Sequence, residues 1–410
     1  MQVTFFYDIV CPYAYLASTR VDDVARAQGA SVAWRPILLG GLFRHVGAPQ
    51  RPGDVMSAPR ARLIDLDMRR WAEVWGVPLR KPAEHPRRSV EAMRLIVGAP
   101  AERRRGLSRD LFEAYWVRGE NVAERAVLDA IATRHGVDPQ VIDGEEARTT
   151  LFANTAEAAG IGAFGVPTFA VGHRFTWGQD RFALLERMLG GEAVDPAAAH
   201  RVPTAVDGPL HVRFFHDFSS PFSYLASTQI ERVVRRAGAT LEWVPILLGG
   251  LFREIGTADV PLLAMNEAKQ RWFRQDLHDW ADAWGVPFTF PAHFPLRTVL
   301  PLRAALVEPA CTAAVYRAAW AEDRPIDDPE VLTRVLREAG FDAGAILERT
   351  SAPAIKDDLR RNTEAAREAG ACGVPTFEVR RPGHDPLILW GQDRLSMLAD
   401  VLGGWWPTCG

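Results

Sequence analysis

The chain has 410 residues, of which 48% are hydrophobic and 24% charged, and its 48 basic and 51 acidic residues give a formal net charge of −3. This ordinary globular composition excludes a mainly disordered chain, and the near-neutral charge excludes a broad basic field for nucleic acid or an anionic membrane. Four cysteines are too few for a disulfide scaffold. The sequence shows no secretory signal and no run of about 18 apolar residues, so a cytoplasmic protein without a membrane span is expected.

The sequence contains two copies of one pattern. VTFFYDIVCPYAYLAST from Val3 returns as VRFFHDFSSPFSYLAST from Val212, which is 209 residues later. Four further blocks return in the same order: WRPILLGGLFR as WVPILLGGLFR, WAEVWGVP as WADAWGVP, FGVPTF as CGVPTF, and WGQDR unchanged. A repeat of this length is far longer than a solenoid unit, so the chain is predicted to be a tandem duplication of a whole domain.

Each copy shows the same order of predicted elements. In copy 1 the run VTFFYDI predicts a strand, a helix is expected from about Tyr13 to Ala27, and SVAWRPILL predicts a second strand. A β-α-β segment of this length indicates a parallel strand pair with a right-handed crossover. Helical signals follow, and then GVPTFAV and HRFTW predict a hairpin before a closing helix in RFALLERMLGG. The order βαβ, helical block, ββα indicates an α/β fold.

The predicted division of the chain follows from this repeat. Copy 1 covers residues 1–195 with its helical block over about 55–159, and copy 2 covers 211–410 with its helical block over about 262–369. Residues 196–210 are rich in Ala, Pro and Gly and lack periodicity, which predicts a linker.

Cys11 lies at the predicted junction between the first strand and the first helix. The unpaired N–H groups and the dipole at a helix N-terminus favour a thiolate, so a lowered pKa is predicted for this thiol. The equivalent residue of copy 2 is Ser220, whose hydroxyl could donate a hydrogen bond to the thiolate of another molecule; both residues could instead be simple N-caps. Because Ala14 stands three residues after Cys11, dithiol–disulfide cycling within the motif is excluded.

Two further blocks recur in both copies, and each has an ordinary structural interpretation beside a functional one. Val166-Pro167 and Val374-Pro375 precede a predicted strand, and an X-Pro bond is the common source of a cis peptide, although a trans turn is more frequent. In WGQDR, Gln179-Asp180 and Gln392-Asp393 could cap the following helix. The ten histidines form no Cys/His cluster, and no phosphate-binding loop or G-x-S-x-G frame is present, so no metal site is expected.

Taken together, FFHDFSSPFSYLAS, PILLGGLF, AKQRWFRQDLHDWADAWGVPF, GVPTF and WGQDR resemble the 2-hydroxychromene-2-carboxylate isomerase family. This family belongs to the kappa-class glutathione transferases and is related to the DsbA-type thioredoxin fold. The resemblance covers nearly the whole of each copy and implies two tandem thioredoxin-like domains, each with an inserted all-helical subdomain. It also implies cis Val-Pro bonds, with the neighbouring backbone pairing with glutathione as an added strand.

The resemblance implies a glutathione site in copy 2. Ser220 matches the family serine that hydrogen-bonds the glutathione sulfur, and Lys269 matches the family lysine near the glutathione carboxylate and the substrate. The backbone at Val374-Pro375 would pair with the cysteinyl residue of glutathione. Gln392-Asp393 matches the pair that takes the γ-glutamyl end.

Copy 1 departs from the family pattern at two of these positions. Cys11 replaces the serine and Arg60 replaces the lysine, whereas Val166-Pro167 and Gln179-Asp180 are retained. Arg60 keeps the charge but not the point-like geometry of an ammonium group. Cys11 could supply its own thiolate, form a mixed disulfide with a small thiol, or be a relic. The family asparagine after the LLGG block is replaced in both copies, by Ala48 and Thr257.

The implied activity is a glutathione-dependent cis-trans isomerase. A thiolate of glutathione, or of another low-molecular-weight thiol, would add to a conjugated double bond of an aromatic substrate and leave again. The same site could instead conjugate an electrophile as a glutathione transferase, Cys11 alone could act as a thiol oxidoreductase, or the duplication could be a non-catalytic thiol binder.

The remaining expectations concern partners. A small aromatic or electrophilic substrate is expected, with a place in aromatic catabolism, and no metal, nucleic acid or membrane partner. Candidate walls of the substrate pocket, with core packing as the alternative, are Tyr13, Phe222 and Tyr224. Because relatives in the family form homodimers, the two copies are expected to pack as an internal pseudo-dimer.

Overall fold

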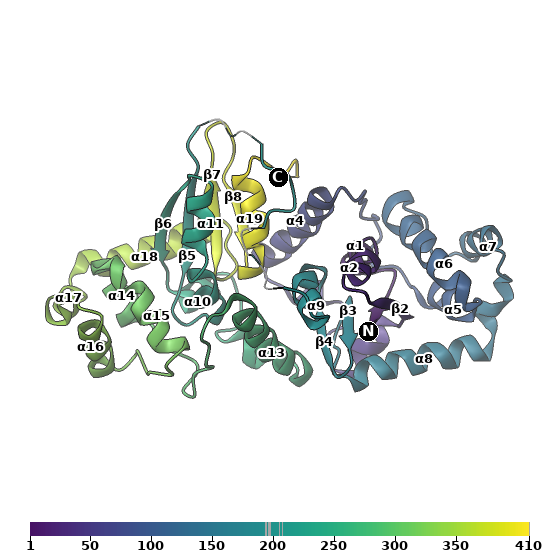
Figure 1. Cartoon of the computed structure of the whole chain (residues 1–410), viewed down its shortest axis with the longest axis horizontal. Helices are drawn as coiled ribbons and strands as arrows, with labels where there is room; N and C mark the ends of the chain where they lie inside the picture. The colour runs from purple at the N-terminus through teal and green to yellow at the C-terminus, as the bar shows by residue number, and fades with distance from the viewer. Residues whose placement is uncertain (193–194, 196–197, 205, 207, 410) are drawn as a thin grey trace. The chain divides into compact units, whose positions relative to one another are not determined.

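The computed structural model describes residues 1–192, 195, 198–204, 206 and 208–409 (Figure 1). Within the predicted linker 196–210, residues 196, 197, 205 and 207 lie outside this description. The chain forms two compact units. Unit 1 comprises Met1–Val55, Met68–Val194 and Met265–Phe273, and unit 2 comprises Met56–Asp67, Asp195–Ala264 and Arg274–Gly410. Each unit therefore contains one half of the sequence together with a short segment from the other half.

Unit 1 is built on a four-stranded mixed sheet with the order β2-β1-β3-β4. The central strand β1 pairs with β2 in parallel and with β3 antiparallel, and β3 and β4 form an antiparallel hairpin. The strands are β1 (Gln2–Tyr7), β2 (Ser31–Pro36), β3 (Thr168–Val171) and β4 (Arg174–Trp177). The predicted parallel pair and the predicted hairpin are both confirmed.

Unit 2 repeats this sheet with the order β6-β5-β7-β8 and the same strand directions. Its strands are β5 (His211–His216), β6 (Thr240–Pro245), β7 (Thr376–Arg380) and β8 (Leu387–Trp390). In each unit an aromatic residue at the middle of the central strand stands opposite a tryptophan: Phe5 opposite Trp34, and Phe214 opposite Trp243. The duplicated α/β fold is therefore present in both halves.

The first predicted helix is divided in two. The structure has α1 (Pro12–Ser18) and α2 (Val21–Ala27) in place of one helix over 13–27. The hydroxyl groups of Ser18 and Thr19 donate hydrogen bonds back to the carbonyls of Tyr15 and Leu16, at 2.6 and 2.7 Å. Such local bonds compete with the helical ladder and favour a break at this point.

A short helix follows each second strand, where the sequence suggested continued strand. These helices are α3 (Leu39–His45) and α12 (Leu248–Glu254). In unit 1 the chain leaves the sheet after β2, because the N–H groups of Leu38 and Leu39 bond to the side chains of Thr155 and Asp8 and not to a neighbouring strand.

A helical block interrupts each thioredoxin-like core, as predicted. In unit 1 the block includes α5 (Val90–Gly98), α6 (Ala101–Glu113), α7 (Arg125–Arg134) and α8 (Glu145–Gly160), and α9 (Phe182–Met188) follows the hairpin. In unit 2 the core helices are α10 (Pro221–Ser227), α11 (Ile230–Arg236) and the closing α19 (Leu395–Leu402), and the block includes α14 (Val299–Val307), α15 (Thr312–Trp320), α16 (Pro329–Glu338), α17 (Ala343–Arg349) and α18 (Pro353–Glu368). Figure 1 shows α14 to α17 gathered at the β6 end of the unit 2 sheet, away from β8.

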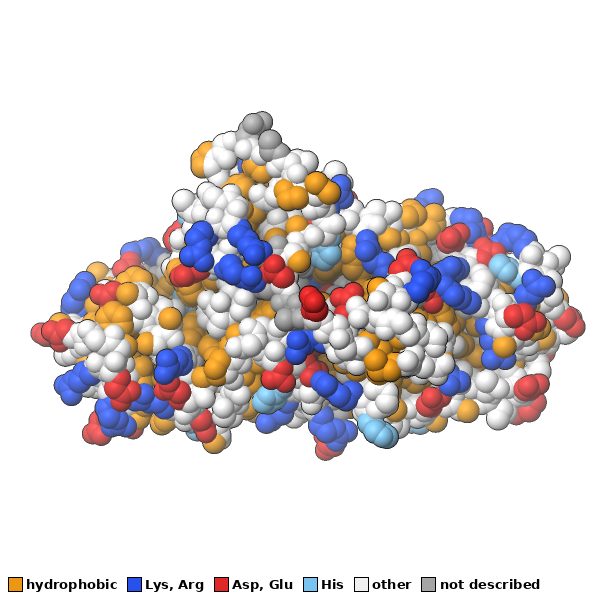
Figure 2. Space-filling model, in the orientation of Figure 1, with side chains coloured by type: hydrophobic (Ala, Val, Ile, Leu, Met, Phe, Trp, Pro, Cys, Tyr) orange, Lys and Arg blue, Asp and Glu red, His pale blue; other side chains and the backbone are white. Residues whose placement is uncertain are grey.

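Two long helices are divided between the units. The first residues of α4 (Ala58–Trp75) belong to unit 2 and the rest to unit 1. The first residues of α13 (Glu267–Trp284) belong to unit 1 and the rest to unit 2. None of the helices in the described part of the chain is long and apolar enough to cross a membrane. On the face shown in Figure 2, basic and acidic side chains are interspersed.

Each helical block is tied to the loop that precedes the first helix of its core. In unit 1 the indole N–H of Trp116 donates to the carbonyl of Ile9 at 2.8 Å. In unit 2 the indole N–H of Trp320 donates to the carbonyl of Phe218, also at 2.8 Å. Both tryptophans are fully buried, so these bonds form within the apolar core and fix the position of the loop.

A buried carboxylate joins three segments in unit 1. Asp8, which is 1% exposed, accepts hydrogen bonds from the N–H groups of Val10 and Leu39 at 3.2 and 2.9 Å, and from the hydroxyl of Ser89 at 3.1 Å. Leu39 begins α3, and Ser89 immediately precedes α5 of the helical block. Burial raises the pKa of this carboxyl group to about 6, and the hydrogen bonds oppose the rise.

Unit 2 has the same arrangement. Asp217 accepts hydrogen bonds from the N–H groups of Ser219 and Leu248 at 2.9 and 2.8 Å, and from the hydroxyl of Thr298 at 2.7 Å. Burial raises the pKa of Asp217 as well. The same three segments are therefore joined in both halves of the chain.

The raised pKa predicts how Asp8 affects stability. Because the folded-state pKa of about 6 exceeds the ordinary value of 3.8, the contribution of this group to the free energy of unfolding is fully present below about pH 4 and is lost as the pH rises through 6. We expect the difference in unfolding free energy between the wild type and an Asp8→Asn variant to fall by about 3 kcal/mol over this range. Urea titrations at pH 4, 5, 6 and 7 would measure it.

An Asp54→Asn variant, changed at an exposed position, controls for the loss of one carboxyl group. A wild-type-minus-Asp8→Asn difference that stays constant with pH would contradict a raised pKa for Asp8.

Candidate active site

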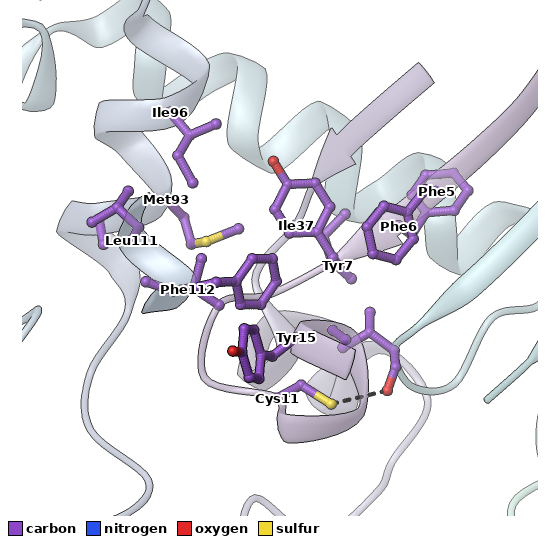
Figure 3. Close-up of a cluster of buried hydrophobic side chains, with 14 of the residues drawn as sticks. Phe5, Phe6, Tyr7, Cys11, Tyr15, Ile37, Met93, Ile96, Leu111 and Phe112 are labelled. Carbon is purple, nitrogen blue, oxygen red and sulfur yellow. Dashed lines mark hydrogen bonds between the residues drawn. The ribbon is translucent and has the colours of Figure 1, made fainter. Parts of the chain in front are cut away.

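The residue before the first helix of each core contacts the backbone of a distant loop. The sulfur of Cys11, immediately before α1, donates to the carbonyl of Val166 at 3.2 Å (dashed in Figure 3). The hydroxyl of Ser220, immediately before α10, donates to the carbonyl of Val374 at 3.1 Å and accepts from the N–H of Ser223 at 3.2 Å. Ser220 therefore caps its helix, as one of the two interpretations of the sequence expected, and also contacts the candidate glutathione loop.

Cys11 is not an activated thiol. The residue is 7% exposed and lies at the border of a cluster of buried aromatic and aliphatic side chains, which Figure 3 shows. Burial raises the pKa of its thiol to about 12, and hydrogen bonding from the backbone at Ala14 and Tyr13 only partly opposes this effect. The prediction of a lowered pKa from the helix N-terminus is therefore wrong, because desolvation outweighs the effect of the seven-residue helix.

Both Val-Pro peptide bonds are cis, as the resemblance implied. They are Val166-Pro167 and Val374-Pro375, each directly before the third strand of its sheet. In both loops a threonine closes the turn: the hydroxyl of Thr168 donates to Gly165 at 2.8 Å, and that of Thr376 donates to Gly373 at 2.7 Å. The cis bonds at His85-Pro86 and Phe294-Pro295 were not anticipated.

The WGQDR loops adjoin the cis-proline loops. In unit 2 the N–H of Gly391 donates to the carbonyl of Pro375 at 2.9 Å, and in unit 1 Gly178 donates to Pro167 at 3.0 Å. Gly391 has a φ of 111°, and a Cβ there would collide with the carboxylate of Asp393, so the loop requires glycine at this position.

The two glutamines of these loops carry buried amide groups. Gln179 and Gln392 are 3% and 2% exposed, and within the described residues the Nε2 atom of each has no hydrogen-bond partner. An unsatisfied buried amide is costly, and a polar ligand at this loop would satisfy it. The following aspartates are paired along the chain: Asp180 with Arg181, and Asp393 with Arg394, both at 3.0 Å.

The two candidate cations lie in the units opposite to their own halves of the sequence. Arg60 belongs to unit 2, where its guanidinium lies 5.7 Å from the centre of the Trp390 ring. Lys269 belongs to unit 1, where its ammonium lies 5.6 Å from the Trp177 ring and 5.9 Å from the Phe164 ring. These distances are within the range of cation–π contacts. The resemblance implied that Lys269 serves the Ser220 site; in the structure Lys269 lies beside Trp177 of unit 1, and Arg60 lies beside Trp390 of unit 2.

The side chains around these cations differ between the units. In unit 1, Trp272 packs against Phe164 and Trp177 with ring centres 5.3 and 5.2 Å apart. In unit 2 the corresponding surroundings are aliphatic or contain a thiol: Leu63, Cys372 and Ile388 form a buried cluster with Trp390 packed against it. Leu63 and Ile388 were not among the candidates selected from the sequence.

The candidate aromatic walls are placed as follows. Tyr224 is 4% exposed, and its hydroxyl donates to the carbonyl of Pro287 at 2.6 Å, which is the core packing that the sequence left open. Tyr13 and Phe222 are half-buried. Tyr13 packs against the hydrophobic core of unit 1.

The four cysteines are free thiols, and Cys311 and Cys372 are buried with pKa values raised by burial to about 12. Among the described residues no group of three or more His, Cys, Asp or Glu side chains could hold a metal ion.

Comparison with known proteins identifies the family. The family described as DSBA-like thioredoxin domain matches residues 2–190 and again residues 211–403. The chain belongs to this family. Its two matches correspond to the two halves of the repeat, so the chain is a tandem duplication of the DsbA-like domain.

Known relatives of this DsbA-like chain include isomerases and transferases. It is 30% identical over 201 residues to a 2-hydroxychromene-2-carboxylate isomerase of Sphingobium xenophagum, which covers 47% of this chain and 97% of the relative. It is 26% identical over 214 residues to glutathione S-transferase kappa 1 of Homo sapiens, covering 48% and 93%. A solved structure of a 2-hydroxychromene-2-carboxylate isomerase matches with 24% identity and a TM-score of 0.40, covering 46% of this chain and 95% of that one. The resemblance deduced from the motifs is confirmed.

The high pKa of Cys11 in the DsbA-like core predicts a slowly reacting thiol. With a pKa of about 12, only about 3 in 100,000 molecules carry the thiolate at pH 7.5, and the thiolate is the nucleophile. We expect iodoacetamide to alkylate Cys11 at least about 100-fold more slowly than a free cysteine. Mass spectrometry of the peptide that contains Cys11 would follow the reaction.

The same peptide in urea-unfolded protein provides the control, because unfolding restores an ordinary thiol. Equal alkylation rates in folded and unfolded protein would show that burial does not protect Cys11.

Proposed function

We propose that the chain is a glutathione-dependent isomerase of the 2-hydroxychromene-2-carboxylate isomerase type, with its principal site at Ser220 in unit 2. The observation that carries this proposal is the contact between the Ser220 hydroxyl and the carbonyl of Val374, directly before a cis proline. The relatives with this printed activity supply the reaction class.

The residues of unit 2 fit glutathione in three places. The buried Nε2 atom of Gln392 has no partner in the described structure, so the γ-glutamyl carboxylate would satisfy it. Asp393, next in the chain, supplies a carboxylate for the γ-glutamyl amino group. The backbone of Val374 offers its carbonyl to the cysteinyl N–H in the manner of an added strand.

Ser220 has a specific task in this scheme. When bound, glutathione supplies a thiolate that adds to a conjugated double bond, permits rotation about the resulting single bond, and leaves. The Ser220 hydroxyl would turn from the Val374 carbonyl to the sulfur and donate to it, while the carbonyl becomes free for the cysteinyl N–H. A preorganised hydrogen-bond donor stabilises the negative charge on the sulfur.

A second candidate is a glutathione transferase that conjugates an electrophile at the same site. Relatives named glutathione S-transferase kappa favour it. The two reactions share the thiolate and differ in whether it leaves, so product mass distinguishes an isomer from a conjugate. The oxidoreductase alternative has less support, because the pKa of Cys11 is about 12.

The proposal also covers the substrate, the thiol, the location of the protein and the packing of its two halves. A small conjugated aromatic compound is the expected substrate, with aromatic catabolism in the cytoplasm as the setting, and another low-molecular-weight thiol in place of glutathione is the alternative. We also propose that the two halves pack as an internal pseudo-dimer, which the segment from the opposite half in each unit supports.

Replacement of Ser220 tests the function. We expect Ser220→Ala to lower the glutathione-dependent isomerisation of 2-hydroxychromene-2-carboxylate about 100-fold or more in kcat, because one preorganised donor to the developing anion is lost. The absorbance change of the substrate, with and without glutathione, measures it.

Ser227→Ala is a matched control at the other end of α10, where the hydroxyl donates a hydrogen bond to the carbonyl of Tyr224 one turn earlier in the same helix. Isomerisation that is independent of glutathione, or full activity of Ser220→Ala, would overturn the proposed mechanism.

A further inference from the structure

Four side chains at or just before the start of α4, within the segment 56–67 of unit 2, contact other parts of that unit. Just before the helix, Ser57 lies 3.4 Å from the hydroxyl of Thr257. Arg60 stands over Trp390, and Leu63 packs in the cluster with Cys372 and Ile388. One turn further, Asp67 accepts two hydrogen bonds from Arg394, at 2.6 and 2.8 Å. A spacing of three or four residues places these side chains on one helix face.

These contacts hold Arg60 beside Trp390 and near Cys372, the residues that lead into the two loops of the Ser220 site. Its ring partner Trp390 immediately precedes Gly391 and Gln392, and its positive charge acts on the thiol of Cys372, two residues before Val374. Within the described residues, the buried Nε atom of Arg60 has no hydrogen-bond partner. A guanidinium group in this position can donate two parallel hydrogen bonds to a carboxylate.

The corresponding contacts of α13 are in unit 1. Lys269 stands over Trp177 and Phe164, and Trp272, one turn later on the same face, packs against the same two rings. Trp177 immediately precedes Gly178 and Gln179, so Lys269 lies beside the WGQDR loop of the Cys11 site.

We propose that the two sites have exchanged their cationic residues, so that Arg60 serves the Ser220 site and Lys269 serves the Cys11 site. Each cation binds a carboxylate group of glutathione beside the WGQDR loop of its unit. The inference rests on the proposed function for the identity of the ligand. By position in the sequence, Lys269 would serve the Ser220 site and Arg60 the Cys11 site; the proposal reverses this pairing.

The exchange determines which cation is combined with the hydroxyl and which with the thiol. The Ser220 site combines a hydroxyl donor with a planar, fork-shaped guanidinium, whereas the Cys11 site combines a neutral thiol with a compact ammonium group. A carboxylate that receives two parallel hydrogen bonds is held in one orientation, and a carboxylate beside an ammonium group is not. Arg60 is therefore a specificity-determining residue for the proposed reaction.

The exchange of cations can be tested by measuring glutathione binding in two variants, each of which has one of the two sites disabled. Gln179→Ala removes the buried amide of the Cys11 site, and Gln392→Ala removes that of the Ser220 site, both in the full chain. In the Gln179→Ala background we expect Arg60→Met to weaken glutathione binding tenfold or more and Lys269→Met to change it less than twofold. In the Gln392→Ala background we expect Lys269→Met to weaken binding tenfold or more and Arg60→Met to change it less than twofold. Titration calorimetry measures the affinity in both backgrounds.

Charge-conserving variants show whether weaker binding results from a lost contact with the ligand or from a loss of folding. Arg60→Lys and Lys269→Arg keep the charge, so each should recover part of the affinity that the methionine variant loses, with thermal melting as the check on folding. If Lys269→Met weakens binding in the Gln179→Ala background and Arg60→Met does not, the exchange is wrong although the proposed function stands. If the wild-type chain does not bind glutathione, the proposed function fails, and the inference fails with it.

Discussion

The buried carboxylate at the end of the first strand is the constraint on which each site depends. Asp8 joins the strand end, the start of α3 and the segment before α5, and Asp217 does the same in unit 2. The thiol or hydroxyl residue follows three positions later, with its own N–H bonded to the aspartate carbonyl. Because the helical block is attached to the core at this point, a shift of either part would move Cys11 or Ser220 relative to its proline loop.

Burial of these carboxylates costs desolvation free energy, and the same effect determines the protonation state of the residue at the site. A carboxylate in a fully buried position is desolvated, and three hydrogen bonds recover only part of the loss, so its pKa is raised. The same burial raises the pKa of Cys11, whereas a serine hydroxyl at the equivalent position is neutral in any case and needs only to donate. Burial thus disfavours a resident thiolate at Cys11 and is compatible with a hydroxyl donor at Ser220.

Much of the fold follows from sequence, but part of the site does not. The repeat, the parallel strand pair, the hairpin and the inserted helices were predicted because hydrophobic periodicity and turn residues are local signals. The grouping of Ser220, Val374 and Gln392 followed from the family motifs. The low pKa expected for Cys11 was wrong because burial depends on the whole core. The placement of Arg60 and Lys269 could not be deduced, because helical spacing indicates which residues share a face and not which unit that face contacts.

The segment that each unit takes from the opposite half changes how a duplicated chain can evolve. After an ordinary tandem duplication, one copy is free to accumulate changes while the other keeps the activity. Here residues 56–67 are encoded with the first half but belong to the second unit, and residues 265–273 show the reverse. If Arg60 and Lys269 serve the sites of the opposite halves, as proposed, selection on either site acts on both halves of the gene, and a half with an altered nucleophile position remains under constraint.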